Sequence, residues 1–210
     1  MAPAPPPPAS FTFPPSLSPF NVSKEDYLSK LNEDAATKLD HLATGAIVFS
    51  SHHTDQQDRI ILVQRASHDS MPNRWEIPGG AVDDGEKILD GLAREVWEES
   101  GLKVKKMEAA VWEGQMFHTT RGKRVCKFTF VVEAENSGEV KLDPNEHQDY
   151  VWATEEECQA KRVVRSEEGK GATELVFTTA PQEAAILRAF AWRKENRGAS
   201  IPVYNHVRAA

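Results

Sequence analysis

Residues 80–102 constrain the fold of this chain more than any other segment, because they set a glycine turn ahead of a helix that carries four glutamates. Three of them, Glu95, Glu98 and Glu99, are three and four residues apart and therefore share one helix face. Carboxylates gathered in this way repel one another unless a cation lies between them, and hard oxygen ligands suit Mg²⁺ or Mn²⁺. The segment predicts a metal site and, through it, chemistry on phosphates.

The distribution of charge supports a cation at this segment. The chain has a formal net charge of −7. Residues 76–99 alone hold eight acidic and two basic side chains, so nearly all of the excess acidity surrounds the motif, where a divalent cation would offset it. An acidic chain of this kind does not favour a nucleic-acid polymer as a partner.

Length and composition indicate a cytoplasmic globular protein. The 210 residues suffice for one domain with a sizeable core, and no apolar stretch is long enough to cross a membrane. The first residues lack the basic and apolar regions of a secretory signal, so Cys126 and Cys158 are interpreted as reduced thiols that fill space. Neither a monomer nor a homodimer is favoured.

Proline dominates the N-terminus, and residues 1–35 are therefore predicted to be a flexible tail, with a short helix near residues 21–30 that Ser23 would cap. Residues 36–205 are predicted to form the folded domain. Alternating or apolar runs predict strands over residues 43–50, 59–65, 104–113, 125–135 and 150–153. Helices are predicted over residues 86–100 and 181–196, and the mixture favours an α/β/α sandwich.

The helix segment resembles a known family. The pattern Gly-x5-Glu-x7-Arg-Glu-apolar-x-Glu-Glu-x-Gly-apolar, which is the Nudix box, is satisfied at each position from Gly80 to Leu102. The resemblance extends over about residues 43–190 and implies the Nudix α/β/α sandwich with a mixed central sheet. It also implies metal-dependent hydrolysis of a nucleoside diphosphate that is linked to another group.

The resemblance assigns roles within the box. It implies that Glu95, Glu98 and Glu99 bind Mg²⁺ or Mn²⁺ with the carbonyl of Gly79, and that Arg94 holds a helix glutamate in place. Glycines at 79 and 80 would also let a substrate phosphate approach the backbone. Glu86 would support the loop before the helix, although its favourable position at the positive end of the helix is an equal explanation.

Residues outside the box carry weaker signals. Family members often use one more acid from a later loop as a metal ligand or base, and Glu146 is the first choice here, with Glu113 and Glu133 in reserve. A solvent-facing loop acid is an equal explanation for Glu146. Arg65 resembles family arginines that reach a substrate phosphate, with a surface charge as the equal alternative, and Phe117 is a candidate to stack on a base. Trp75 is assigned to the core in preference to stacking, and a lone loop histidine such as His118 usually has no catalytic role.

The substrate is inferred largely from residues that are absent after the box. Between Leu102 and Asn145 the only proline is Pro144, and the first tyrosine after the box is Tyr150, whereas ADP-ribose and dinucleoside polyphosphate hydrolases of the family carry such residues earlier. A nucleoside triphosphate pyrophosphohydrolase is therefore the first hypothesis. A hydrolase of another diphosphate, such as a nucleotide sugar, and a non-catalytic binding module remain as alternatives.

Overall fold

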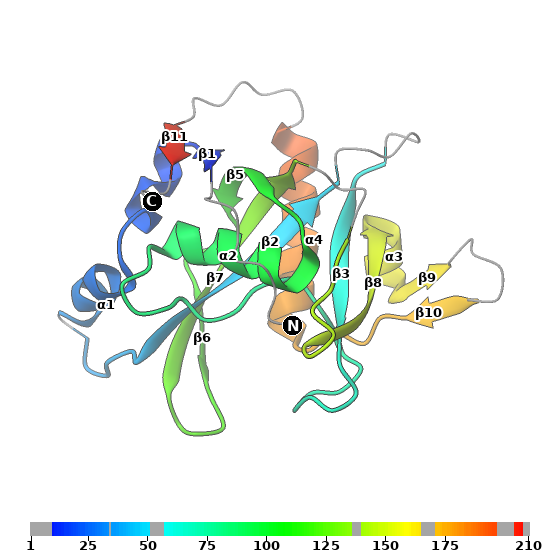
Figure 1. The fold of residues 1–210 in the computed structure, drawn as a ribbon, viewed down its shortest axis with the longest axis horizontal. Helices are drawn as coiled ribbons and strands as arrows, with labels where there is room; N and C mark the ends of the chain where they lie inside the picture. The colour runs from blue at the N-terminus through cyan, green and yellow to red at the C-terminus, as the bar shows by residue number, and fades with distance from the viewer. Residues whose placement is uncertain are drawn as a thin grey trace.

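The computed structural model describes residues 10–33, 35–50, 57–135, 140–164, 171–196 and 204–207. A nine-stranded mixed sheet lies at the centre, in the order β11-β1-β5-β7-β2-β3-β4, with β6 paired to β7 and β8 paired to β3. Helices α2 and α4 cover its opposite faces (Figure 1). The predicted α/β/α architecture with a mixed central sheet is confirmed.

The elements follow one another along the chain with these bounds. The strands are β1 (Ser10–Phe13), β2 (His41–Phe49), β3 (Arg59–Arg65), β4 (Trp75–Glu76), β5 (Val104–Ala110), β6 (Gln115–His118), β7 (Arg124–Ala134), β8 (His147–Thr154), β9 (Arg162–Val164), β10 (Ala172–Glu174) and β11 (Tyr204–Val207). The helices are the 3₁₀ helix η1 (Pro15–Phe20) and the α-helices α1 (Lys24–Asn32), α2 (Ile88–Ser100), α3 (Glu155–Ala160) and α4 (Ala180–Asn196).

Strand β2 has two different neighbours on its two edges. On one edge it pairs in parallel with β7 along its whole length, from His41 to Phe49. On the other edge it pairs with β3 only at Phe49. The remainder of this edge is hydrogen-bonded to residues 78–82, where the amides of Ala46 and Thr44 donate to the carbonyls of Pro78 and Gly80. The loop that precedes α2 is therefore fixed to the middle of the sheet by backbone hydrogen bonds.

Two apolar clusters lie on the two faces of the sheet. One packs α2 through Ile88, Leu89, Leu92 and Val96, and the other packs α4 through residues such as Phe190. The apolar positions of α2 recur at helical spacing, so burying them turns its glutamate-bearing face away from this cluster. This packing holds the carboxylates on a rigid element.

Local signals account for several helix ends. Gly101 ends α2 in the left-handed conformation that glycine favours, with φ of 68°, directly after Ser100, the predicted last residue of the helix. The hydroxyl of Ser23 accepts a hydrogen bond from the Asp26 amide at the start of α1. Thr154 forms a reciprocal capping box with Glu157 at the start of α3.

The sequence pattern also predicts that the strands over residues 104–113 and 125–135 pair across a turn at Arg121-Gly122. Strand β5 does pair antiparallel with β7. The turn at Gly122, however, joins β7 to the short strand β6, which lies between the two predicted strands and was not predicted. The extra strand brings Gln115 and Phe117 alongside β7.

The expectation of a flexible N-terminal tail over residues 1–35 is wrong for the part that the structure describes. Phe11, Phe13 and Leu17 are buried in the α2 cluster, and β1 pairs in parallel with β5 and antiparallel with β11. Proline blocks regular ladders but does not prevent burial of the apolar residues between prolines. The first nine residues, which hold the densest proline run, lie outside the described residues.

The structure also describes the two cysteines, which the sequence analysis interpreted as reduced thiols that fill space. Cys126 and Cys158 are both free and buried, and burial raises their thiol pKa values to about 11 and about 12. Within the described ranges, no helix combines the length and apolarity that a membrane crossing requires.

Replacement of Phe13 by alanine tests the corrected role of the N-terminal segment. Phe13→Ala should lower the free energy of unfolding by about 3 kcal/mol, the cost of a large cavity in a packed core. Chemical denaturation of the variant measures this change. Ser10→Ala, on the same strand but exposed, is the control, and an equally small effect of both substitutions would restore the tail interpretation.

Candidate metal centre and substrate pocket

Gly79 and Gly80 are required by close contacts. Gly79 has φ of 148°, and a Cβ there would lie 2.2 Å from the carbonyl oxygen of Thr44 on β2. A Cβ on Gly80 would lie 2.7 Å from the carboxylate of Glu95. The two glycines thus let the loop approach the sheet on one side and the glutamate helix on the other.

Arg94 is the cationic centre of the helix face. Its guanidinium donates to Glu95 at 2.9 Å and to Glu98 at 2.8 Å, and also to the carbonyl of Ala81 at 2.9 Å. Its remaining donors reach Glu86 at 3.0 and 3.1 Å. One planar side chain therefore holds three carboxylates and the loop backbone, a geometry that suits the fixed donors of arginine.

Glu86 belongs to this network and is not merely a charge near a helix end. Its buried carboxylate accepts from Arg94 and from the amide of Asp83 at 3.1 Å. Gly91 makes room for it, because a Cβ there would lie 2.9 Å from the Glu86 carboxylate. The geometry favours the support of the loop over the alternative explanation from the helix dipole.

Glu99 is the most deeply buried of the three glutamates on the shared helix face. One of its oxygens accepts the Gly79 amide at 2.7 Å, and its relative exposure is 6%. Burial raises the pKa of the Glu99 carboxyl well above its ordinary value, and the Gly79 hydrogen bond offsets only part of this effect. Burial also raises the pKa of Glu95, with Arg94 acting in the opposite direction.

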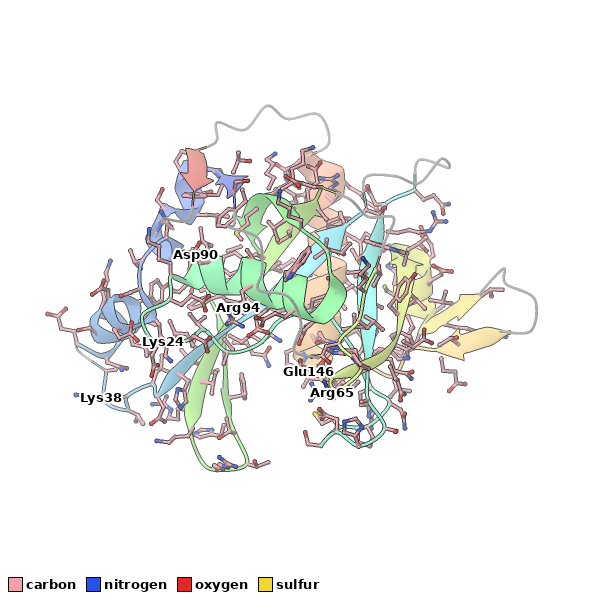
Figure 2. All side chains as sticks on the ribbon, in the orientation of Figure 1. Lys24, Lys38, Arg65, Asp90, Arg94 and Glu146 are labelled. Atoms are coloured by element: carbon pink, nitrogen blue, oxygen red, sulfur yellow. The ribbon has the colours of Figure 1, made fainter. Side chains whose placement is uncertain are left out.

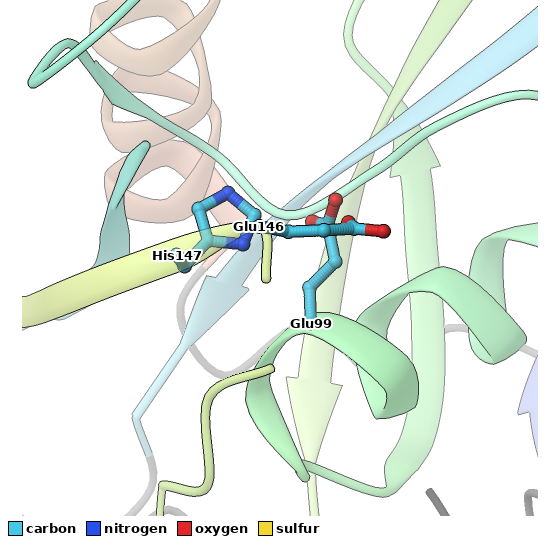
Figure 3. Close-up of side chains that lie close together, drawn as sticks. All are labelled: Glu99, Glu146 and His147. Atoms are coloured by element: carbon cyan, nitrogen blue, oxygen red, sulfur yellow. The ribbon is translucent and has the colours of Figure 1, made fainter. Parts of the chain in front are cut away.

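Glu146 reaches the same place from the other side of the site. It precedes β8, and its carboxylate, a His147 ring nitrogen and a Glu99 oxygen lie within 4.8 Å of one another. Figure 3 shows Glu99 extending from α2 toward Glu146 and His147. The structure therefore brings Glu146 to the box, while Glu95 and Glu98 are turned to Arg94.

The donor set fits a hard divalent cation. Glu99 is buried beside Glu146, and neither carboxylate forms an ion pair with a basic side chain among the described residues. The Nδ1 atom of His147 is buried and has no hydrogen-bond partner in the described part of the chain. A buried carboxylate with a raised pKa, such as Glu99, beside a second carboxylate is an arrangement that Mg²⁺ or Mn²⁺ stabilises.

A pocket opens next to this centre. It has a volume of about 410 Å³, within the range of small-molecule sites, and both Arg65 and Phe117 line it. Arg65 is held by Asp69 at 2.6 Å and by Glu76 at 2.7 Å, and Phe117 is 38% exposed. Figure 2 shows Arg65 close to Glu146.

Lys127, Glu76 and His147 were missed by the sequence analysis. Lys127 projects from β7 into the pocket, where a Cβ on the neighbouring Gly45 would lie 2.9 Å from its Cε atom. Burial lowers the pKa of its ammonium, although Glu76 and Glu99 act against this shift. The available signal for Lys127 was a charged residue inside a strand in which most residues are apolar.

Glu76 links the pocket to the carboxylate cluster. Its carboxylate accepts from Arg65 and lies 3.2 Å from Nε2 of His147. Residues 65, 76 and 147 come from three different strands, so no spacing in the sequence could reveal their contact.

The sequence analysis also considered four residues outside the box, and the structure gives each of them a defined environment. Glu133 forms an ion pair with Lys105 on the sheet, and Glu113 is exposed in the bend between β5 and β6. Trp75 is buried in the α4 cluster, which confirms its assignment to the core. His118 does line the pocket.

Comparison with known proteins identifies the class. The NUDIX domain family matches residues 39–170. A MutT-like protein of Streptomyces ambofaciens is 29% identical over 131 residues, which are 62% of this chain and 75% of that protein. The chain is therefore a member of the Nudix hydrolase family, which acts on phosphorus anhydrides.

Other relatives match over shorter lengths. The m7GpppN-mRNA hydrolase NUDT17 of Bos taurus is 42% identical over 64 residues, which are 30% of this chain but only 20% of that protein. The structure of a C. elegans Ap4A hydrolase has a TM-score of 0.55 at 18% identity, covering 74% of this chain and 99% of that one. This structural likeness shows the shared fold alone.

Replacement of Glu99 by glutamine tests how far the ionised, buried Glu99 carboxylate destabilises the metal-free protein. The folded-state pKa of Glu99 is raised, so its stability contribution is greatest at low pH and is lost as the pH rises through that value. Without metal at pH 8, Glu99→Gln should therefore unfold about 2 °C or more above the unaltered protein.

Thermal unfolding in a chelator measures this difference, which should shrink toward pH 4.5, the ordinary carboxyl value. Glu113→Gln, at an exposed acid, should change nothing. A Glu99→Gln protein that melts lower than the unaltered chain at pH 8 would contradict the account.

Proposed function

We propose that this chain is a divalent-metal-dependent pyrophosphohydrolase that converts a nucleoside triphosphate to a monophosphate and pyrophosphate. The observation that carries the proposal is the Arg94 network, which fixes a complete Nudix box beside a pocket large enough for a nucleoside. A cluster of carboxylates alone would not distinguish this chemistry from a solvated surface.

The proposed ligands of the metal are Glu95, Glu98, Glu99, Glu146 and the Gly79 carbonyl. Bound Mg²⁺ or Mn²⁺ would neutralise phosphate oxygens and lower the pKa of a water molecule. Arg94 and Glu86 keep the helix carboxylates in place through the hydrogen bonds described above. Glu99 is buried and only 13% of the Glu95 side chain is exposed, so the protein shields much of both carboxylates from solvent.

The reaction consumes one water molecule. Its oxygen forms a bond to phosphorus while the bond from that phosphorus to the bridging anhydride oxygen breaks. The proposed proton acceptor is the Glu146 carboxylate, which is exposed and lies within 4.8 Å of a Glu99 oxygen. The bridging oxygen leaves with pyrophosphate, and the nucleoside remains as its monophosphate.

The pocket supplies the proposed contacts to the substrate. Phe117 offers an exposed ring on which a base can stack, and Arg65 presents a cation at the edge of the site. Lys127 adds an ammonium that has no hydrogen bond or ion pair with the described residues, so its donors are available to a phosphate or base oxygen. Gly80 leaves the backbone open to a phosphate.

The choice of a nucleoside triphosphate depends on the missing proline and tyrosine after the box. A nucleotide sugar remains the alternative within the same chemistry. A non-catalytic binding module is disfavoured, because all four residues are present: Arg94 holds Glu95 and Glu98, and the Gly79 amide holds Glu99. The cattle relative, whose name describes an mRNA hydrolase, makes capped RNA a necessary control against the expectation of no nucleic-acid polymer.

A substrate panel with Mg²⁺ tests the proposal. Nucleoside triphosphates, nucleotide sugars, dinucleoside polyphosphates and a capped RNA would be compared by kcat/KM, with products resolved by ³¹P NMR. The proposal expects pyrophosphate from a triphosphate at the highest kcat/KM. Turnover that is highest on another diphosphate would support the alternative, and the absence of turnover on all compounds would favour a binding module.

Glu98→Gln should remove most of the activity. The loss of one strong electrostatic element at the transition state should cost at least about 3 kcal/mol, or more than a hundredfold in kcat/KM. Steady-state kinetics on the substrate found in the panel measures it, with Glu113→Gln as the control. Retained turnover would show that another carboxylate carries the role.

Lys127→Met tests the pocket contact. The loss of a charge-assisted hydrogen bond to the substrate should raise KM about tenfold while kcat changes less. Lys123→Met, at an exposed lysine four residues away, should leave both constants unchanged. An unaltered KM in the Lys127 variant would show that the ammonium does not contact the substrate.

A further inference from the structure

Residues 22–25 contact the loop that leads into α2, although they lie outside the matched family region of residues 39–170. The amide of Lys24 donates to the Glu86 carbonyl at 2.9 Å, and the amide of Ile88 donates to the Val22 carbonyl at 3.1 Å. Ser23 and Lys87 face each other between these bonds as an antiparallel bridge. The N-terminal segment therefore adds a short ladder to the loop.

Two side chains reinforce this ladder. The Lys24 ammonium forms an ion pair with Asp84, and the Glu25 carboxylate accepts the Gly85 amide at 3.0 Å. Lys24 is buried, with 7% of its surface exposed, whereas the Asp84 side chain is almost fully exposed. Figure 2 shows Lys24 between α1 and the N-terminal end of α2. Residues 22–25 thus contact residues 84–88 through backbone hydrogen bonds and through the side chains of Lys24 and Glu25.

The segment is itself firmly anchored. Phe20 packs edge-on against Phe128 and Phe130, with ring centroids 5.0 and 5.1 Å away, and stacks on Tyr27 at 5.6 Å. These contacts fix both sides of residues 22–25 to β7. A loop bound to such an anchor loses conformational freedom that it would otherwise have.

The contacts continue from this loop to the metal centre. Residues 84–88 include Glu86, whose carboxylate binds Arg94, and Arg94 in turn binds Glu95 and Glu98. Outer contacts that orient metal-binding side chains commonly change metal affinity when they are removed. The positions of the proposed ligands thus depend on a segment that makes no contact with the metal.

We propose that residues 22–25 form an N-terminal clamp that positions the Nudix-box carboxylates for a divalent cation, with Lys24 and Glu25 as positioning residues. The inference rests on the proposed metal site but not on the proposed substrate. In this proposal the N-terminal segment supports the metal centre by positioning its ligands, although it does not contact the metal.

Mn²⁺ binding to the full-length protein tests the clamp without any nucleotide. The double variant Lys24→Met/Glu25→Ala removes both side-chain contacts and should weaken Mn²⁺ binding about tenfold, as measured by the loss of the free-ion EPR signal. The matched control is Lys30→Met/Glu33→Ala, which makes the same two kinds of change at exposed positions at the other end of α1. Lys24→Arg/Glu25→Gln should restore most of the affinity.

Asp84→Asn provides a second test from the loop side. Its side chain is 92% exposed, so the substitution cannot open the core, and it should also weaken Mn²⁺ binding while the melting temperature of the metal-free protein stays unchanged. Wild-type affinity in both the double variant and Asp84→Asn, or an equal loss in the matched control, would overturn the clamp. An unaltered chain that binds no Mn²⁺ would overturn the metal site itself, and the clamp with it.

Discussion

The guanidinium of Arg94 is the interaction on which the site depends. It donates to Glu86, Glu95 and Glu98 and to the loop carbonyl of Ala81. Three acids would otherwise repel one another on a helix and loop that are packed together. Their attraction to Arg94 raises its pKa, so the guanidinium stays charged at any physiological pH. A lysine could not make the same contacts, because its single ammonium lacks the planar array of donors.

The sheet explains how this helix comes to lie where it does. Strand β2 pairs with β3 only at Phe49, its last residue, and residues 78–82 form backbone hydrogen bonds with the earlier part of that edge. Gly79 allows this close approach, and its amide then binds Glu99. The same backbone segment therefore joins the centre of the sheet to the buried carboxylate of Glu99. Strand β8, paired with β3, brings Glu146 and His147 to the opposite side.

Local sequence signals predicted much of the fold and of the box. Helix α2 begins two residues later than expected and ends at Ser100 as predicted, because the period of Ile88, Leu89, Leu92 and Val96 and the stop at Gly101 are local properties. The proximity of Glu146 was anticipated from the family resemblance. The roles of these residues in binding or catalysis remain proposals.

Long-range contacts could not be predicted in the same way. Glu76, Lys127 and His147 lie on separate strands, and only the register of the sheet brings them near one another or near the pocket. The proline-rich composition of the N-terminus concealed the buried Phe13 and Leu17, because composition averages over the apolar positions that actually pack. A short apolar motif between prolines carries no periodicity to reveal its burial.

The most direct test of the account is a crystal structure of the protein with Mn²⁺ and a non-hydrolysable nucleoside triphosphate analogue, with the ion located by anomalous scattering. The account predicts an ion coordinated by the helix carboxylates, with Arg94 still bound to Glu86 and the base in the pocket beside Phe117 and Lys127. An ion bound elsewhere, with Glu95, Glu98 and Glu99 all pointing into solvent, would contradict it.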